Sequence, residues 1–217
     1  MAKPPKPLPP TADLVHIIQA AVANAEALAD DAAYLMAAGR VCRAHSLAVL
    51  AVEEMGKALL CIIATFPTPE VRNDFWKHYN SHGAKLAYAH GALTLLLGDG
   101  KAPVAEQLGS VVAAVAGDSA TKLSGLYVDY VDTDVRTPAD SVTAEDARAA
   151  ILAARTLVDE IGVRWTGEEV LARLRAAQED TAVGTILDQA RDAAGQAPEA
   201  LLGATRRFYH DPLGLES

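Results

Sequence analysis

Acidic and basic side chains occur between residues 40 and 65, in a segment that is otherwise apolar on almost every side. The charged residues are Arg40, Arg43, Glu53, Glu54 and Lys57. On a helix that turns about 100° per residue, these side chains fall within an arc of roughly 140°. A charge inside a helical bundle costs several kcal/mol unless another group pairs with it. The pattern therefore predicts either a polar network with a neighbouring helix or an exposed groove.

Lys57 follows Glu53 and Glu54 at spacings that allow a salt bridge within one helix. Pairs at i,i+3 and i,i+4 are ordinary features of helix surfaces and stabilise a helix only slightly. Such a pair at the bundle surface is one interpretation of the charges. The other is a site in which these residues act together with groups on the next helical segment.

Histidines and a lysine follow between residues 69 and 97. His78, His82 and Lys85 are spaced by four and three residues, so a continuous helix would present an imidazole and an amine on one face. Gly83 weakens that continuity. The two histidines also have metal-ligand spacing, but no carboxylate or cysteine accompanies them locally. We therefore expect neither a metal ion nor a small-molecule cofactor.

Hydrophobic periodicity and end signals predict the helices that must position these residues. The expected helices cover residues 11–38, 40–65, 69–97 with a break near 80–83, 104–117 and 143–161. Thr11 and Thr143 are candidate N-caps, and Gly39 is a candidate stop. Thr166 with Glu169 predicts a further capped helix, followed by shorter helices over 186–193 and 198–207. Residues 122–137 have poor periodicity and predict a loop with a short helix.

The composition fits an all-α protein with one domain and an extension. Hydrophobic residues make up 51% of the 217 residues, but only 5% are aromatic and many are alanine, a balance that suits closely packed helices. We expect a disordered, proline-rich lead over residues 1–10, an antiparallel helical bundle over 11–165, and a C-terminal helical extension and tail over 166–217.

The charge and the cysteines exclude several classes of protein. A formal net charge of -9 argues against a general DNA-coating or anionic-membrane role, although a local basic patch could still hold RNA. Cys42 and Cys61 predict buried thiols in a reducing compartment, the cytoplasm. The N-terminus has no apolar signal region, and no eighteen apolar residues run without interruption, so we expect no membrane span.

Three blocks of sequence together resemble the AbiV family. The strongest is NAEALADDAAYLMAAGRVCRAHSLAVLAVEEMGKALL, over Asn24 to Leu60, with its Glu-Glu-x-Gly-Lys signature. The others are FWKHYNSHGAKL, over Phe75 to Leu86, and KLSGLYVDYV, over Lys122 to Val131 and followed by Pro138. Each block alone is weak, but their order makes the resemblance specific. It covers about Asn24 to Pro138 and does not extend beyond Trp165.

The resemblance implies a HEPN-like helical bundle, often a homodimer, and a role in abortive infection, in which an infected bacterium stops growing before phage can mature. Many HEPN proteins are metal-independent ribonucleases with an Arg-x(4 to 6)-His motif. Arg40 with His45, and Arg206 with His210, match that spacing. On one helix, however, Arg40 and His45 diverge by about 140°. The alternative is a helix-start arginine and a structural histidine whose polar atoms are satisfied.

If the protein cleaves RNA, the candidate catalytic residues are Arg43, Glu54, Lys57, His82 and Lys85. We expect His82 to act as general base or acid, because imidazole suits proton transfer at neutral pH. Lys85, Lys57 and Arg43 would bind phosphate, and Glu54 would orient the imidazole. The alternative is that these residues only join two helices, and that the protein binds a phage or host protein through a helical surface.

Overall fold

A computed structural model describes residues 6–65, 69–97, 126–131, 134–168 and 172 of the chain. Its helices are α1 (Thr11–Ala37), α2 (Val41–Ala64), α3 (Pro69–Tyr79), α4 (His82–Leu97), α7 (Pro138–Ser141), α8 (Ala144–Leu157), a π-helical turn (Val158–Gly162) and α9 (Val163–Thr166). Two strands of three residues, β1 (Asp129–Val131) and β2 (Asp134–Arg136), also occur in the described part of the chain. Helices dominate, which confirms the predicted all-α class.

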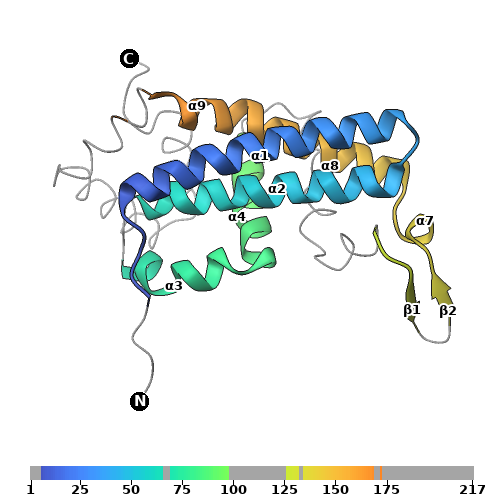
Figure 1. Ribbon diagram of the computed structural model, residues 1–217, viewed down its shortest axis with the longest axis horizontal. Helices are drawn as coiled ribbons and strands as arrows, with labels where there is room; N and C mark the ends of the chain where they lie inside the picture. The colour runs from blue at the N-terminus through green and yellow to red at the C-terminus, as the bar shows by residue number, and fades with distance from the viewer. Residues whose placement is uncertain (1–5, 66–68, 98–125, 132–133, 169–171, 173–217) are drawn as a thin grey trace.

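Helices α1 and α2 form a long antiparallel hairpin (Figure 1). Arg40 N donates to Leu35 O at 2.8 Å and Gly39 N donates to Met36 O at 3.1 Å, a pattern that ends a helix in a left-handed residue. Gly39 supplies that residue with a φ of +72°, so the predicted stop is confirmed. Small side chains allow close packing along both helices, and the buried alanines are Ala21, Ala25, Ala29, Ala32, Ala44, Ala48, Ala51, Ala58 and Ala64.

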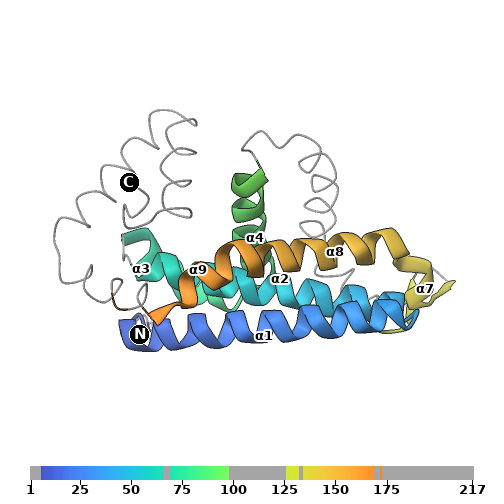
Figure 2. The ribbon, with the colours of Figure 1, turned by 90° about the horizontal axis from the view of Figure 1, so that it is seen from above.

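Helix α8 lies against both members of this hairpin and runs along them (Figure 2). Its predicted cap is confirmed, because the Thr143 hydroxyl accepts from Asp146 N at 3.1 Å and Thr143 N donates to the Asp146 carboxylate at 2.9 Å. The chain continues through the π-helical turn into α9, where Trp165 is buried. The predicted helix over residues 143–161 is thus confirmed.

Helix α4 crosses α2 instead of running beside it (Figures 1 and 2). Helix α3 ends at Tyr79 and α4 begins at His82, so the predicted break near residues 80–83 is confirmed. At this corner, Asn80 Nδ2 donates to Trp76 O at 2.7 Å, and Ala84 N donates to the Ser81 hydroxyl at 3.2 Å. These bonds satisfy backbone groups at the two helix ends and define where α4 starts.

The start of α1 differs from the prediction by one residue. Pro10 is the N-cap, and its carbonyl accepts from Asp13 N and Leu14 N, each at 3.0 Å. Thr11 is therefore the first helical residue rather than the cap. Pro10 has an extended backbone, with φ -55° and ψ 151°, which allows its carbonyl to begin the helix without a capping side chain.

The prediction of a loop with a short helix over residues 122–137 is wrong in its described part. Strands β1 and β2 pair antiparallel, with Tyr130 opposite Val135. Valine and tyrosine favour strands, and pairing between neighbouring segments does not require the long periodicity of a helix. A short helix does follow, α7, which is capped by Thr137 and Asp140.

The proline-rich lead contacts α3 and the core through residues 6–8. Trp76 Nε1 donates to Pro7 O at 2.9 Å, and Lys6 Nζ lies 3.4 Å from the centre of the Trp76 ring. Leu8 packs against the core. These residues thus contact an aromatic side chain far along the chain, which composition does not reveal, while the disorder expected over residues 1–10 stays a prediction.

Several predictions about the later part of the chain concern residues outside the described ranges. These are the helices over 104–117, 186–193 and 198–207, the pair Arg206 and His210, and Glu169. Thr166 is described, and it ends α9 with its hydroxyl donating to Gly162 O at 3.0 Å. Among the helices described, none is long and apolar enough to cross a membrane.

Candidate catalytic site at the contact of helices α2 and α4

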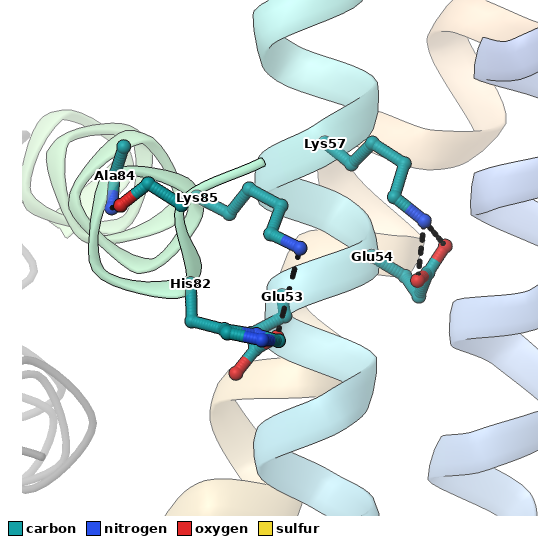
Figure 3. A network of polar contacts seen from close by, with 7 residues as sticks. Glu53, Glu54, Lys57, His82, Ala84 and Lys85 are labelled. Carbon is teal, nitrogen blue, oxygen red and sulfur yellow. Dashed lines mark hydrogen bonds and ion pairs between the residues drawn. The ribbon is translucent and has the colours of Figure 1, made fainter. Parts of the chain in front are cut away.

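The centre of the candidate site is Glu53, a carboxylate buried in the middle of α2. Its side chain is only 3% exposed. Two cationic or ionisable groups from α4 reach it: His82 Nδ1 lies 2.6 Å from Glu53 Oε2, and Lys85 Nζ lies 3.9 Å from the same oxygen (Figure 3). A neighbouring helix thus supplies the partners that the charge of α2 required.

His82 and Lys85 differ sharply in their access to solvent. The His82 side chain is 58% exposed, whereas the Lys85 side chain is 11% exposed. His82 is the first residue of α4, and Lys85 follows one turn later, so both side chains approach Glu53 from the same side. The His82 end of this Glu53–His82–Lys85 cluster is therefore open to solvent, while the Lys85 end is mostly buried in the bundle.

Glu54 and Lys57 form a separate pair on α2. Lys57 Nζ donates to both carboxylate oxygens of Glu54, at 2.5 and 2.7 Å. The two side chains are 20% and 21% exposed, and they point away from the His82–Glu53 contact (Figure 3). This is the ordinary i,i+3 salt bridge of the first interpretation. The carboxylate that meets His82 is Glu53, so the expected contact between Glu54 and the imidazole is wrong.

Arg43 lies far from the cluster along the same helix. It is exposed, and it precedes Glu53 by ten residues, which corresponds to about 15 Å of helix rise. The structure therefore brings together His82 and Lys85 from the predicted set, places Glu54 with Lys57, and leaves Arg43 apart.

The Arg40–His45 pair diverges as its spacing on a helix requires. Arg40 is the exposed N-cap of α2, whereas His45 is 2% exposed. Burial lowers the pKa of His45, and the Asp146 carboxylate at the start of α8 opposes that shift. Within the described part of the chain, His45 Nδ1 has no hydrogen-bond partner, so the expectation of a satisfied structural histidine is wrong at this atom.

His78 does not share a face with His82, because the break at residues 80 and 81 separates their helices. His78 Nδ1 lies 3.1 Å from the Tyr88 hydroxyl, whose pKa is raised chiefly by burial. The two imidazoles therefore have different partners, and the continuous His78–His82–Lys85 face does not form.

Both cysteines are free thiols, as predicted. Cys61 is buried, and Cys42 is only half-buried. Burial raises the pKa of the Cys61 thiol to about 12, so this residue stays protonated at neutral pH and is a poor nucleophile.

Sequence reasoning noticed Glu53 but assigned the central role to its neighbour Glu54. A signal was available in the spacing of apolar residues. Val49, Gly56 and Leu60 lie one or two turns from Glu53 on the same side of the helix, and all three are buried. A carboxylate in the middle of such a stripe faces the interior, where it needs a partner from another helix.

A HEPN-type family model described as AbiV matches residues 13–159 of the chain. The match includes most of α1 and all of α2, α3, α4 and α8, and therefore every residue of the Glu53–His82–Lys85 cluster. Neither the curated proteins nor the solved structures contain a match to this chain.

Proposed function

We propose that this chain, which belongs to the AbiV family of HEPN-type proteins, is an abortive-infection effector that cleaves RNA without a metal ion. The observation that carries the proposal is a solvent-exposed imidazole held by a buried carboxylate, with the Lys85 ammonium group beside them. Buried charge is costly, and a chain that needed only a stable bundle could place an apolar residue at position 53. A chemical role for the cluster is supported by the free-energy cost of burying the Glu53 carboxylate together with the exposure of the His82 ring to solvent.

In this proposal His82 transfers the proton. If Nδ1 carries a hydrogen and donates it to Glu53, Nε2 is the basic nitrogen of the neutral ring. Nε2 accepts the proton of a ribose 2′-hydroxyl while that oxygen attacks the adjacent phosphorus. The bond from phosphorus to the 5′-oxygen breaks, which leaves a 2′,3′-cyclic phosphate. The leaving oxygen takes a proton from water, and the hydroxide that remains is neutralised by the proton that the His82 imidazolium releases. Glu53 fixes the ring orientation and stabilises the imidazolium that forms.

The cationic residues have graded roles. Lys85 is the mostly buried member of the Glu53–His82–Lys85 cluster, and the positive charge of its ammonium group would stabilise negative charge that develops on a phosphate bound at His82. Lys57, paired with Glu54, and the distant Arg43 would guide the RNA strand rather than touch the reacting phosphate. Glu54 then holds Lys57 instead of orienting His82.

The first test is cleavage of labelled single-stranded RNA by the purified full chain in the presence of a metal chelator. We expect cleavage by the wild-type protein and a loss of about 10²- to 10⁴-fold in rate for His82→Ala, which is the usual contribution of a general acid or base. Circular dichroism should show unchanged helix content, because the His82 ring is mostly exposed.

His16→Ala is the matched control, since His16 is also an exposed histidine on a helix of the bundle but lies on α1. We expect this variant to keep wild-type activity. RNA that stays intact with the wild-type protein under all conditions would remove the proposal. Equal losses in His82→Ala and His16→Ala would remove the assignment of His82.

Dimerisation and location follow the family resemblance. We expect a homodimer, as HEPN-like folds often pair through helices, and a cytoplasmic location in keeping with the two free thiols. Light scattering of the purified chain measures the mass in solution, and a monomer across the working concentration range would contradict the first expectation.

A second candidate function is a non-enzymatic defence factor that binds a phage or host protein. The observation that favours it is a group of exposed apolar side chains in and just before the β1–β2 hairpin. These residues are Leu126, Tyr127, Val128 and Val135. A two-stranded hairpin alone is only marginally stable in water, and a partner could cover these side chains. This reading predicts that phage protection survives His82→Ala and is lost in Tyr127→Ala.

A further inference from the structure

The glycine of the Glu-Glu-x-Gly-Lys signature touches the backbone of α4. A Cβ atom built on Gly56 would lie 1.9 Å from the carbonyl oxygen of Lys85, 2.6 Å from its carbonyl carbon and 3.1 Å from its Cα. Contacts below 3.0 Å are essentially never seen for real Cβ atoms. The obstacle is main chain, so no rotamer change can relieve it, and any side chain at position 56 would push the two helices apart.

This backbone contact lies beside the candidate site. Gly56 follows Glu53 by three residues on α2, and Lys85 follows His82 by three residues on α4. Residues three apart are neighbours on a helix surface, so the backbone contact and the His82–Glu53 bond are one turn apart on both helices. Figure 3 shows α4 meeting α2 at this level, with His82 and Lys85 directed at Glu53.

We infer that Gly56 is a positioning residue, which sets the separation of α2 and α4 at which His82 and Lys85 reach Glu53; its importance for catalysis rests on the proposed function. A Cβ at 1.9 Å must retreat by about 1 Å to become tolerable. A shift of that size stretches the 2.6 Å His82–Glu53 bond beyond hydrogen-bond range. It also takes the Lys85–Glu53 ion pair, already at 3.9 Å, out of contact.

Two other helical glycines provide matched controls. A Cβ on Gly91, in α4 itself, would meet nothing within 4 Å. A Cβ on Gly162 would lie 2.8 Å from Val22 Cγ1, which is the end of a side chain in the core away from the site. The Gly91→Ala variant therefore tests the change of residue type alone, and Gly162→Ala tests crowding of the core without crowding of the α2–α4 contact.

The experiment compares Gly56→Ala, Gly91→Ala and Gly162→Ala in the full chain by NMR with ¹⁵N-labelled histidine. In the wild type, the His82 Nδ1 proton should give a downfield signal typical of a strong hydrogen bond, assigned by its absence in His82→Ala. We expect Gly56→Ala to lose this signal and to lose RNA cleavage by about 100-fold, the usual result of a 1 Å misplacement. Both controls should keep the signal and the cleavage rate.

Circular dichroism accompanies these measurements, and we expect Gly56→Ala to keep the α1, α2 and α8 core. Retention of the downfield signal in a folded Gly56→Ala would overturn the inference. Global unfolding of Gly56→Ala would also overturn it, because the glycine would then serve the whole core rather than one contact. If the wild type does not cleave RNA but the signal follows this pattern, only the proposed function fails, and Gly56 still positions the cluster.

Discussion

His45, within α2, and His82, at the start of α4 beside it, have opposite environments. His82 is more than half exposed, and a buried carboxylate holds one of its nitrogens. His45 is buried, its Nδ1 lacks a partner within the described residues, and burial lowers its pKa. Arg40, which shares a ribonuclease-like spacing with His45, points to solvent at the helix end.

The comparison teaches that the sequence spacing of an arginine and a histidine is not enough to make a proton-transfer site. Such a site needs an imidazole that substrate can reach and a group that fixes its orientation. His82 has both, whereas His45 is buried and, among the residues that the structure describes, has no orienting acceptor at Nδ1. Two packed helices can therefore carry one histidine suited to chemistry, on α4, and another suited to packing, on α2, and only their surroundings distinguish them.

The largest effect that separates the two regions should come from Glu53→Gln. The change removes the negative charge of Glu53. That charge orients His82 and compensates the positive charge of the poorly exposed Lys85. We expect RNA cleavage to fall by at least about 100-fold, and the free energy of unfolding to fall by about 3 kcal/mol, the scale for a broken buried pair. Chemical denaturation and the RNA assay measure the two effects.

Glu54→Gln is the matched control for that prediction. It makes the same chemical change one residue later, but it breaks only a partly exposed i,i+3 pair with Lys57. We expect a loss of about 0.5 kcal/mol or less and near-normal cleavage. Equal effects of the two substitutions would mean that burial of the His82 partner is not what distinguishes the site.

A smaller effect should appear in the pH dependence of stability, through His45. The folded protein holds this ring neutral below its ordinary pKa of 6.5, so on acidification the unfolded chain takes up the proton first. Stability from this residue is thus present above about pH 6.5 and is lost below it, at up to about 1.4 kcal/mol per pH unit. Denaturation curves recorded between about pH 7 and pH 5 give the free energy of unfolding at each pH, and this free energy should change less with pH in His45→Leu than in the wild type.

Asp146 does not confuse this measurement. Its pKa is lowered chiefly by the hydrogen bonds from Thr143, so its stabilising effect disappears only as the pH falls below its ordinary value of 3.8. Near pH 7, His45→Leu should stay within about 1 kcal/mol of the wild type, since leucine has a similar volume. An unchanged acid slope in this variant would show that His45 is not the neutral buried group.

The smallest effect should come from Arg40→Ala. The Arg40 side chain is exposed at the start of α2, so its removal should change cleavage by no more than about twofold and leave thermal stability nearly unchanged. A loss as large as that of His82→Ala would instead identify Arg40 and His45 as the catalytic pair and would reverse the comparison.

Local signals predicted most of the helical framework. Gly39 ends α1 and Thr143 caps α8 through bonds within a few residues of each, so the sequence contains the whole determinant. Short strands such as β1 and β2 depend on pairing between two segments. Periodicity within one segment could therefore not exclude the short helix predicted in this region. The contact of Pro7 with Trp76 joins residues 69 positions apart and has no local signal.

The sequence by itself determined that α2 is an inner helix with charges that require partners, because burial of unpaired charge is too costly for any fold to tolerate. Only the tertiary structure decided which group pairs with each charge. Glu53 and Glu54 are adjacent and chemically identical, but the crossing of α4 over Gly56 turns one toward His82 and Lys85 and leaves the other with Lys57. That choice depends on the separation and angle of two helices, which no pattern within either helix contains.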